Sequence, residues 1–332
     1  MTPSTKSVSH EDRVAALRSR IDDALPALVD GRSPAALYDA VEHVLRAGGK
    51  RVRPVLLLLV AESYGTSVDR AMPAALAVEV FHNFTLVHDD LMDDDDERRG
   101  RPTVHVKWDA GTAMLAGDLM MGLSYDLLGQ VEGTDVEVLY SVYHPMVEHL
   151  CAGQALDASF ETEASVSVEA YLDMIDRKTG ALLSAAFELG GIIGGASESE
   201  REHLREAGQL VGRAFQIQDD LLDLTAREEA WGRGVGGDLV AGKKTFLTLR
   251  ALERADGAEY EWFARLMTDA GLPREDVPEA RERMAALGVF NDAQEAVETY
   301  TEQAYSHLES LDDTPAAETL HWLLDRMKAR DY

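Results

Sequence analysis

The stretch HDDLMD, residues 88–93, has a near-copy in QDDLLD, residues 218–223, about 130 positions later. Each stretch places carboxylates at positions i, i+1 and i+4 of an apolar segment with helical spacing. At 3.6 residues per turn, Asp89 and Asp93 lie on one face of a helix, as do Asp219 and Asp223. Like charges at this spacing destabilise an isolated helix by about 0.2–0.5 kcal/mol. A helix without a ligand therefore gains nothing from the pattern.

Binding of divalent cations would explain these two stretches, which we call the first (residues 88–93) and the second (residues 218–223) aspartate box. Mg²⁺ binds through one or two carboxylates, keeps several waters, and completes its shell with phosphate oxygens of a substrate. One box alone is more often a solvated acidic surface. The matched pair instead favours two helices that face each other and hold a diphosphate through several metal ions.

Composition excludes several classes of protein. Hydrophobic residues make up 45% of the 332 positions, enough for a sizeable core, and the longest apolar run, residues 55–61, is too short to span a membrane. Residues 1–10 lack the features of a secretory signal, and we expect them to be disordered. The single cysteine, Cys151, excludes an internal disulfide and is expected to be buried. These features predict a cytoplasmic protein without stable membrane insertion.

The charge balance is strongly acidic, with 32 basic and 60 acidic residues and a net charge of −28. Nucleic acid is excluded as a partner, because phosphate backbones require a basic surface. Adaptation to high salt is one hypothesis for the excess acid, since ions screen the self-repulsion of such a surface. A folded fraction that stays constant between low and molar salt would contradict it.

Helical periodicity dominates the chain, and strand signals are nearly absent. We find no composition shift that would mark a domain boundary, so we predict an all-α fold with a single large helical domain over residues 11–332. Apolar stretches at 71–92, 181–193 and 209–222 predict central helices that are buried on all sides. The expected helices span residues 11–29, 34–47, 51–64, 68–92, 105–110, 112–130, 134–157, 168–190, 199–224, 244–254, 258–270, 275–286, 290–311 and 315–329.

Basic residues gather in a few places against this acidic background. The segment GGKRVRP, residues 48–54, puts Lys50 and Arg53 near a helix start, where backbone N–H groups also favour an anion. RRGRP, residues 98–102, follows the first box, where guanidinium groups would reach phosphates bound there. Each cluster has a simpler alternative: an ordinary basic helix start for the first, and neutralisation of the acidic residues 94–97 for the second.

A third cluster follows the second box. Residues 232–238 are rich in glycine, and Lys243 and Lys244 come shortly afterwards, which is typical of a mobile lid over phosphates. Glycine-rich loops alone are a weak signal. Lys178 and Thr179, within an otherwise apolar helix, add a cation where a structural residue would be expected.

Together these residues resemble the trans-isoprenyl diphosphate synthases, the farnesyl/geranylgeranyl diphosphate synthase family, over about residues 48–245. The resemblance rests on the order and spacing of GGKRVRP (48–54), HDDLMD with RRG (88–100), GQALD (153–157), Lys178-Thr179, FQIQDDLLD (215–223) and GDLVAGKKT (237–245). It implies an isoprenoid synthase fold of helices around a deep cavity, with the two boxes on opposite walls, and usually a homodimer.

The resemblance also implies roles for individual residues. The reaction that it implies is an Mg²⁺-dependent head-to-tail condensation of isopentenyl diphosphate with a C5, C10 or C15 allylic diphosphate through an allylic carbocation. Three Mg²⁺ would bridge Asp89, Asp93 and Asp219 to the allylic diphosphate, supported by Asp90, Asp220 and Asp223. The allylic diphosphate would also contact Arg98, Lys178, Thr179, Gln216 and Lys243, and isopentenyl diphosphate would contact Lys50, Arg53, His82 and Arg99.

One position departs from the family's pattern. Arg233 stands where the family usually has lysine, so its expected contact with the allylic diphosphate is less well defined, and Gly234 often corresponds to proline. The catalytic set implied by the resemblance is Asp89, Asp90, Asp93, Arg98, Lys178, Asp219 and Lys243.

Product length should depend on the cavity floor below the first box. On a helical wheel Thr85 lies about 40° from Asp89, whereas Phe84 lies about 140° away. In the family, however, both positions help to form the floor, and two aromatic residues there stop the product at C15. The pair Phe84 and Thr85, with Phe81 one turn deeper, resembles geranylgeranyl diphosphate synthases of the archaeal type and predicts a C20 product. Core packing of Phe81 and Phe84, with a farnesyl or longer product, is the alternative.

Two other functions use related features. A non-catalytic subunit of the same fold would be expected to lose box aspartates or diphosphate-binding lysines, which this chain keeps. A terpene cyclase would lack the isopentenyl site, whereas Lys50, Arg53, His82 and Arg99 are all present. The synthase is therefore the preferred interpretation.

Overall fold

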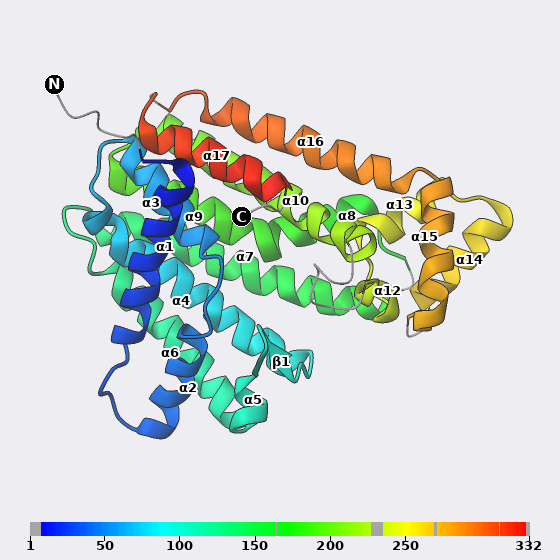
Figure 1. Ribbon diagram of the computed structural model, residues 1–332, viewed down its shortest axis with the longest axis horizontal. Helices are drawn as coiled ribbons and strands as arrows, with labels where there is room; N and C mark the ends of the chain where they lie inside the picture. Colours follow the sequence, from blue (N-terminus) through cyan, green and yellow to red (C-terminus); the bar gives the residue numbers. More distant parts are fainter. Residues whose placement is uncertain (1–7, 164, 227–234, 269–270, 312, 330–332) are drawn as a thin grey trace.

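The computed structural model describes residues 8–163, 165–226, 235–268, 271–311 and 313–329. Helices dominate the described chain (Figure 1), which confirms the all-α prediction. The elements are α1 (His10–Ala27), α2 (Ala35–Leu45), α3 (Val52–Ser63), α4 (Val68–Met92), β1 (Glu97–Arg98), β2 (Arg101–Pro102), α5 (Val104–Lys107), α6 (Ala110–Leu128), α7 (Val136–Thr162), α8 (Val168–Ile175), η1 (Asp176–Gly180), α9 (Ala181–Gly194), α10 (Glu198–Thr225), α12 (Gly237–Val240), α13 (Phe246–Arg254), α14 (Gly257–Thr268), η2 (Arg274–Asp276), α15 (Val277–Ala286), α16 (Val289–Leu308) and α17 (Pro315–Ala329).

The expected helices are all present, and the differences are local. The helix expected over 168–190 is divided into α8 and α9 by a π-helical turn, η1. The helix expected to end at 157 continues to Thr162, with Phe160 buried near its end. The first helix begins at His10 with Ser9 as its N-cap. These two residues are therefore ordered, contrary to the expectation of disorder over residues 1–10. Residues 1–7 lie outside the described part.

The helices α3, α9 and α10 form the centre of the molecule. Nearly every residue of α9 is buried, because the helix packs against α3, α4, α7 and α10. Glycines permit the close approach: a Cβ on Gly190 would lie 2.7 Å from the carbonyl oxygen of Leu57, and one on Gly208 would lie 2.6 Å from the Cα of Ser184. The apolar run at 181–193 therefore does form a helix buried on all sides.

Two hydrophobic clusters meet along α10. The larger one includes the first half of α10 with α1 to α7, α9 and α17, and the smaller one joins its second half to α8 and α13 to α16. In Figure 1, α16 runs along the length of the molecule beside α10, with α14 and α15 at the far end. The apolar residues within and beside the second aspartate box, Ile217, Leu221 and Leu224, thus belong to the smaller cluster.

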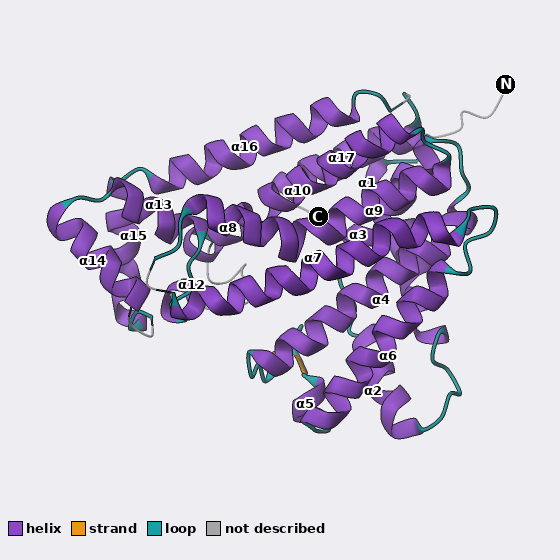
Figure 2. Ribbon diagram, turned by 180° about the vertical axis from the view of Figure 1, so that it is seen from behind, coloured by secondary structure: helices purple, strands orange, loops and turns teal. Residues whose placement is uncertain are grey.

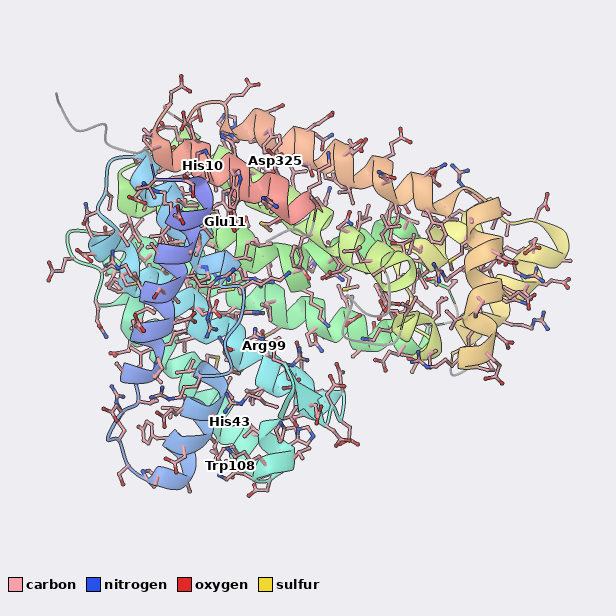
Figure 3. All side chains as sticks on the ribbon, in the orientation of Figure 1. His10, Glu11, His43, Arg99, Trp108 and Asp325 are labelled. Atoms are coloured by element: carbon pink, nitrogen blue, oxygen red, sulfur yellow. The ribbon has the colours of Figure 1, made fainter. Side chains whose placement is uncertain are left out.

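A short hairpin interrupts the helical pattern, as Figure 2 shows. Its two-residue strands β1 and β2 pair in antiparallel fashion, with Arg98 opposite Arg101. Strands of this length are too short to show the alternation that predicts a strand from sequence. Figure 3 shows Arg99 of the hairpin turn, with His43 and Trp108 below it in that view.

Cys151 is exposed, contrary to the expectation that it is buried. The buried residues of α7 follow the 3.6-residue repeat through Tyr143, Met146, Leu150 and Gly153. Position 151 lies about 100° from position 150 around the helix, outside this face. Among the described residues, no helix has both the length and the apolar character needed to cross a bilayer.

Candidate active site

The first aspartate box lies at the end of α4. Asp89 is half-buried in the last turn and Asp93 is the C-cap. Asp90 is buried and accepts a hydrogen bond from Nε of Arg98. Burial raises the pKa of Asp89, although the nearby Lys178 cation opposes the rise. Burial disfavours the ionised form of this carboxylate, and a cation bound beside it would stabilise that form.

The second box lies near the end of α10. Asp219 is half-buried, whereas the Asp220 carboxylate is buried and accepts hydrogen bonds from the Tyr171 hydroxyl, the Phe246 N–H at 3.0 Å and Gln216 Nε2 at 3.2 Å. Burial raises the pKa of Asp220 to about 7. Asp223 accepts a hydrogen bond from the Asp238 N–H at 3.1 Å. With its oxygens occupied in this way, Asp220 is better suited to holding the box in place than to binding a metal directly.

Residues from both boxes line one cavity of about 140 Å³. The Thr179 hydroxyl donates to Gln216 Oε1 at 3.1 Å, and Lys178 forms an ion pair with Asp157. The sequence-predicted residues in its lining are Asp93, Lys178, Thr179, Gln216, Asp220 and Lys243. The structure therefore brings together residues from α4, η1, α10 and the segment before α13.

A π-helical turn presents Lys178 and Thr179 to this cavity. Such turns occur mostly as short insertions in α-helices and often lie at functional sites. The turn packs tightly on α7, since a Cβ on Gly153 would clash with the backbone of Lys178. Gly153 and Asp157 are the first and last residues of GQALD. Asp157 was not predicted as a site residue, although that motif contains it.

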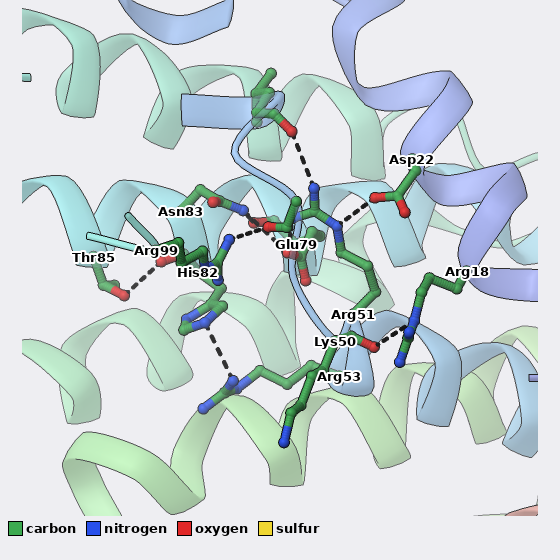
Figure 4. Close-up of polar contacts among 12 residues, drawn as sticks. Arg18, Asp22, Lys50, Arg51, Arg53, Glu79, His82, Asn83, Thr85 and Arg99 are labelled. Atoms are coloured by element: carbon green, nitrogen blue, oxygen red, sulfur yellow. Dashed lines mark hydrogen bonds and ion pairs between the residues drawn. The ribbon is translucent and has the colours of Figure 1, made fainter. Parts of the chain in front are cut away.

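A second cavity, of about 630 Å³, lies beside α3 and α4. It is lined by the predicted cations and by His82, together with apolar residues; the sequence-predicted members are Lys50, Arg53, His82, Arg98 and Arg99. Arg53 Nη1 lies 3.3 Å from His82 Nε2 (Figure 4). Burial, followed by the charges of Arg53 and Arg99, holds the pKa of His82 well below its ordinary value. The imidazole is therefore neutral and accepts the hydrogen bond from Arg53.

Arg51, between the two predicted cations, has a different environment. Its backbone is left-handed, with φ of 50°, and its guanidinium is buried. Figure 4 shows its hydrogen bonds to Glu79 at 2.6 Å, to Asp22 at 2.8 Å and to the carbonyl oxygen of Leu45 at 3.0 Å. Asn83 Nδ2 also donates to Glu79, at 3.1 Å. These contacts join α1, α3 and α4 at the wall of the second cavity, whose lining includes Arg51 and Glu79, and sequence reasoning missed them.

The predicted floor residues divide between two sides of α4. Thr85 lies on the half-buried face with His82 and Asp89, and its hydroxyl donates to the carbonyl of His82 at 2.8 Å. Phe84 is buried, with its ring centroid 5.1 Å from Phe81 and 4.8 Å from His88. The Phe81 ring in turn lies 5.6 Å from Tyr143 of α7. Core packing and a role in the floor are compatible for Phe81 and Phe84.

Two basic positions singled out in the sequence, Arg233 and Lys244, differ from the other predicted cations. Arg233 lies outside the described residues, as do Gly232 and Gly234, whereas residues 235–238 of the glycine-rich segment are described. Lys244 differs from its neighbour Lys243: it is buried, and its ammonium donates to the carbonyl oxygen of Phe160. Both lysines line the first cavity, but the Lys244 ammonium is held by this backbone contact, so Lys243 is the better candidate to bind a ligand there.

The boxes fit hard divalent cations by their chemistry, because all their donors are carboxylate oxygens. No group of three or more acidic, histidine or cysteine side chains among the described residues converges into a metal site by itself. A metal ion held by one box would therefore need further ligands, and phosphate oxygens and water are the natural ones for Mg²⁺.

An all-α bundle with two aspartate boxes that contribute to one cavity, beside a second, cationic cavity, is typical of enzymes of the isoprenoid synthase type. The chain belongs to the polyprenyl synthetase family, whose model matches residues 34–284. It is 39% identical to the geranylgeranyl diphosphate synthase of Methanosarcina mazei over 97% of this chain and 98% of the relative. Proteins of this family are prenyltransferases.

Solved structures agree in fold. The geranylgeranyl pyrophosphate synthetase of Pyrococcus horikoshii superimposes with a TM-score of 0.89 and 36% identity, covering 96% of this chain and 98% of the other. A polyprenyl synthase of Caulobacter crescentus, solved with calcium and isoprenyl diphosphate, gives a TM-score of 0.86 at 28% identity, over 98% of this chain and 99% of the other.

Proposed function

We propose that this protein condenses isopentenyl diphosphate with an allylic diphosphate, head to tail, and releases mainly geranylgeranyl diphosphate. One observation carries the proposal: two separate cavities exist, one reached by both aspartate boxes and one lined by Lys50, Arg53 and His82. A reaction that joins two diphosphate esters needs one anion-binding site for each. A cyclase, which binds a single diphosphate, has no use for the second cavity.

The first cavity would hold the allylic diphosphate. Three Mg²⁺ held by Asp89, Asp93 and Asp219, with Asp90, Asp220 and Asp223 in support, would neutralise charge that develops on the leaving diphosphate. Lys178, Thr179, Gln216 and Lys243 line the same cavity. Their N–H and O–H donors would orient the diphosphate and stabilise it most strongly as the C–O bond breaks. Arg98, which lines the second cavity and forms an ion pair with Asp90 of the first box, is a further proposed contact, as is Arg233 from its place in the sequence.

The second cavity would hold isopentenyl diphosphate through Lys50, Arg53, His82 and Arg99. A neutral His82 can donate one ring N–H to a phosphate oxygen while its other nitrogen accepts from Arg53. The double bond of the bound substrate would then attack C1 of the allylic cation, and a proton would be lost to the departing diphosphate. Exclusion of water from the occupied cavities would protect the carbocation from hydrolysis.

Product analysis tests the proposed reaction. The protein would be incubated with isopentenyl diphosphate, Mg²⁺ and, in parallel, C5, C10 and C15 allylic primers. We expect a C20 product from each accepted primer. An end product of C15, or one longer than C20, would support the proposed condensation but contradict the assignment of the cavity floor. No condensation with any primer would contradict the proposed reaction itself.

Replacing Phe84 should change the product length. Phe84→Ser removes a buried ring from the cluster with Phe81 and His88, so we expect products of C25 or longer to replace most of the C20 product. The reciprocal change, Thr85→Phe, should shorten the product to C15. Chromatography of the dephosphorylated products measures both effects, with Thr85→Val as the control of nearly unchanged volume. An unchanged product in both variants would place the floor elsewhere.

We also propose that the chain forms a homodimer, as the resemblance implies. Met114 and Leu115 are 54% and 59% exposed on α6, and Val106 on α5 is exposed as well. Apolar side chains gathered in this way favour a protein interface. The double variant Met114→Glu/Leu115→Glu should halve the mass measured by light scattering. Tyr260→Glu, at a residue 51% exposed on α14, should leave the mass unchanged; a monomeric unmodified protein would contradict the proposal.

A further inference from the structure

The hairpin of β1 and β2 carries Arg98 and Arg99, yet little within it explains its stability. Each strand has two residues, and an isolated two-stranded hairpin is only marginally stable. The turn places both Arg99 and Gly100 at positive φ, 55° and 69°, which is unfavourable for the arginine. Contacts with the rest of the molecule must therefore hold the hairpin in place.

One such contact joins Arg101 of β2 to the end of α2. Arg101 Nη2 lies 2.9 Å from Nδ1 of His43, and Nη1 donates to the carbonyl oxygen of His43 at 3.1 Å. His43 Nε2 lies 2.9 Å from the carbonyl oxygen of Pro102. One residue of α2 thus contacts both residues of β2.

These partners specify the protonation of His43. A carbonyl oxygen can only accept, so Nε2 carries the hydrogen and Nδ1 is the acceptor for Arg101. Lys107 Nζ, 3.1 Å from Nδ1, is a second donor to the same nitrogen, and the Trp108 ring centroid lies 5.4 Å from that of His43. Burial and the charges of Arg101 and Lys107 lower the pKa of His43, which keeps its ring neutral.

The other end of the hairpin rests on the loop before α3. Arg99 donates from Nη1 to the carbonyl oxygen of Gly48, and a Cβ on Gly49 would lie 3.0 Å from this nitrogen. Arg99 thus attaches the hairpin to the loop before α3, and Arg101, two positions later, attaches it to α2. Arg99 lines the second cavity. A displacement of β2 would therefore move a cation of that cavity.

We propose that His43 and Arg101 are positioning residues for isopentenyl diphosphate: they fix the hairpin so that Arg99 faces the second cavity. This inference rests on the proposed function. Neither residue lines the second cavity in the described part of the chain, so they act through Arg99. Arg98 has its own ion pair with Asp90, so we expect the contact proposed for it with the allylic diphosphate to be retained.

The test combines Arg101→Met with steady-state kinetics and calorimetric titration of isopentenyl diphosphate. We expect KM and Kd for isopentenyl diphosphate to rise about tenfold or more, because two hydrogen bonds from a charged group are lost. The KM of the C15 primer and kcat at saturating substrate should change less than about twofold. Arg46→Met removes an exposed arginine one turn from His43, paired with Glu42, and should change neither constant.

A second pair of variants separates positioning from simple packing. His43→Gln keeps a donor and an acceptor and should bind isopentenyl diphosphate more tightly than His43→Phe, which keeps only the ring. Equal KM increases for both substrates, or an unchanged Kd in Arg101→Met, would overturn the positioning role while leaving the proposed function intact. Failure of the unmodified protein to bind isopentenyl diphosphate would overturn the proposed function, and this inference with it.

Discussion

Asp89→Asn and Asp219→Asn should each reduce turnover by about 10³-fold while leaving the fold unchanged. Asparagine preserves the shape of the side chain but removes the charge that would bind Mg²⁺. Both residues are half-buried, so neither supplies a core contact whose loss would unfold the protein. Initial rates of isopentenyl diphosphate incorporation measure the effect, and circular dichroism verifies the fold.

Asp94→Asn is the matched control for these variants. Asp94 immediately follows the first box, its side chain is fully exposed, and its backbone has a φ of 55°, which asparagine tolerates. Its rate should stay within about twofold of the original. Near-normal rates in Asp89→Asn or in Asp219→Asn would contradict the assignment of that box to metal binding.

Arg51→Ala should lower the free energy of unfolding by about 3–5 kcal/mol. The side chains of Arg51 and Glu79 are only 1% and 3% exposed, so removal of the guanidinium leaves a buried carboxylate without its cation. The midpoint of urea unfolding, followed by circular dichroism, measures the loss. Arg51→Met/Glu79→Leu should recover much of it, because neither member of the pair then remains buried and unpaired.

Arg46→Ala provides the comparison for Arg51→Ala. Arg46 and Glu42 form an i,i+4 ion pair at the surface, and the arginine side chain is 57% exposed. Loss of such a pair should cost no more than about 0.5 kcal/mol. Similar losses in Arg51→Ala and Arg46→Ala would mean that the buried network contributes little to stability.

Helical periodicity is the signal from which the positions of the helices and the faces of α4 could be predicted. It placed the helices to within a few residues, because apolar positions repeat along each one. It also put Asp89 and Thr85 on one face of α4, where both are half-buried. The two groups of cations were assigned by resemblance; Lys178 and Lys243 line the first cavity and Lys50, Arg53 and Arg99 line the second, whereas Arg98, assigned to the allylic group, also lines the second.

Long-range polar contacts account for most of what could not be predicted. Arg51 and Glu79 are 28 positions apart, and Arg101 and His43 are 58 apart, so no local pattern links either pair. Neither the π-helical turn at Lys178 nor the two-residue strands produce a periodic signal. Exposure of Cys151 was missed because its residue type was given more weight than its position on the helix.

Calorimetric titration with farnesyl thiolodiphosphate, an allylic analogue that resists ionisation, tests the central claim most directly. The claim is that the two aspartate boxes hold an allylic diphosphate together through divalent metal ions. We predict tight binding in Mg²⁺, loss of binding in EDTA, and at least about tenfold weaker binding in both Asp89→Asn and Asp219→Asn. Equal affinity with and without EDTA, or binding that depends on only one box, would contradict it.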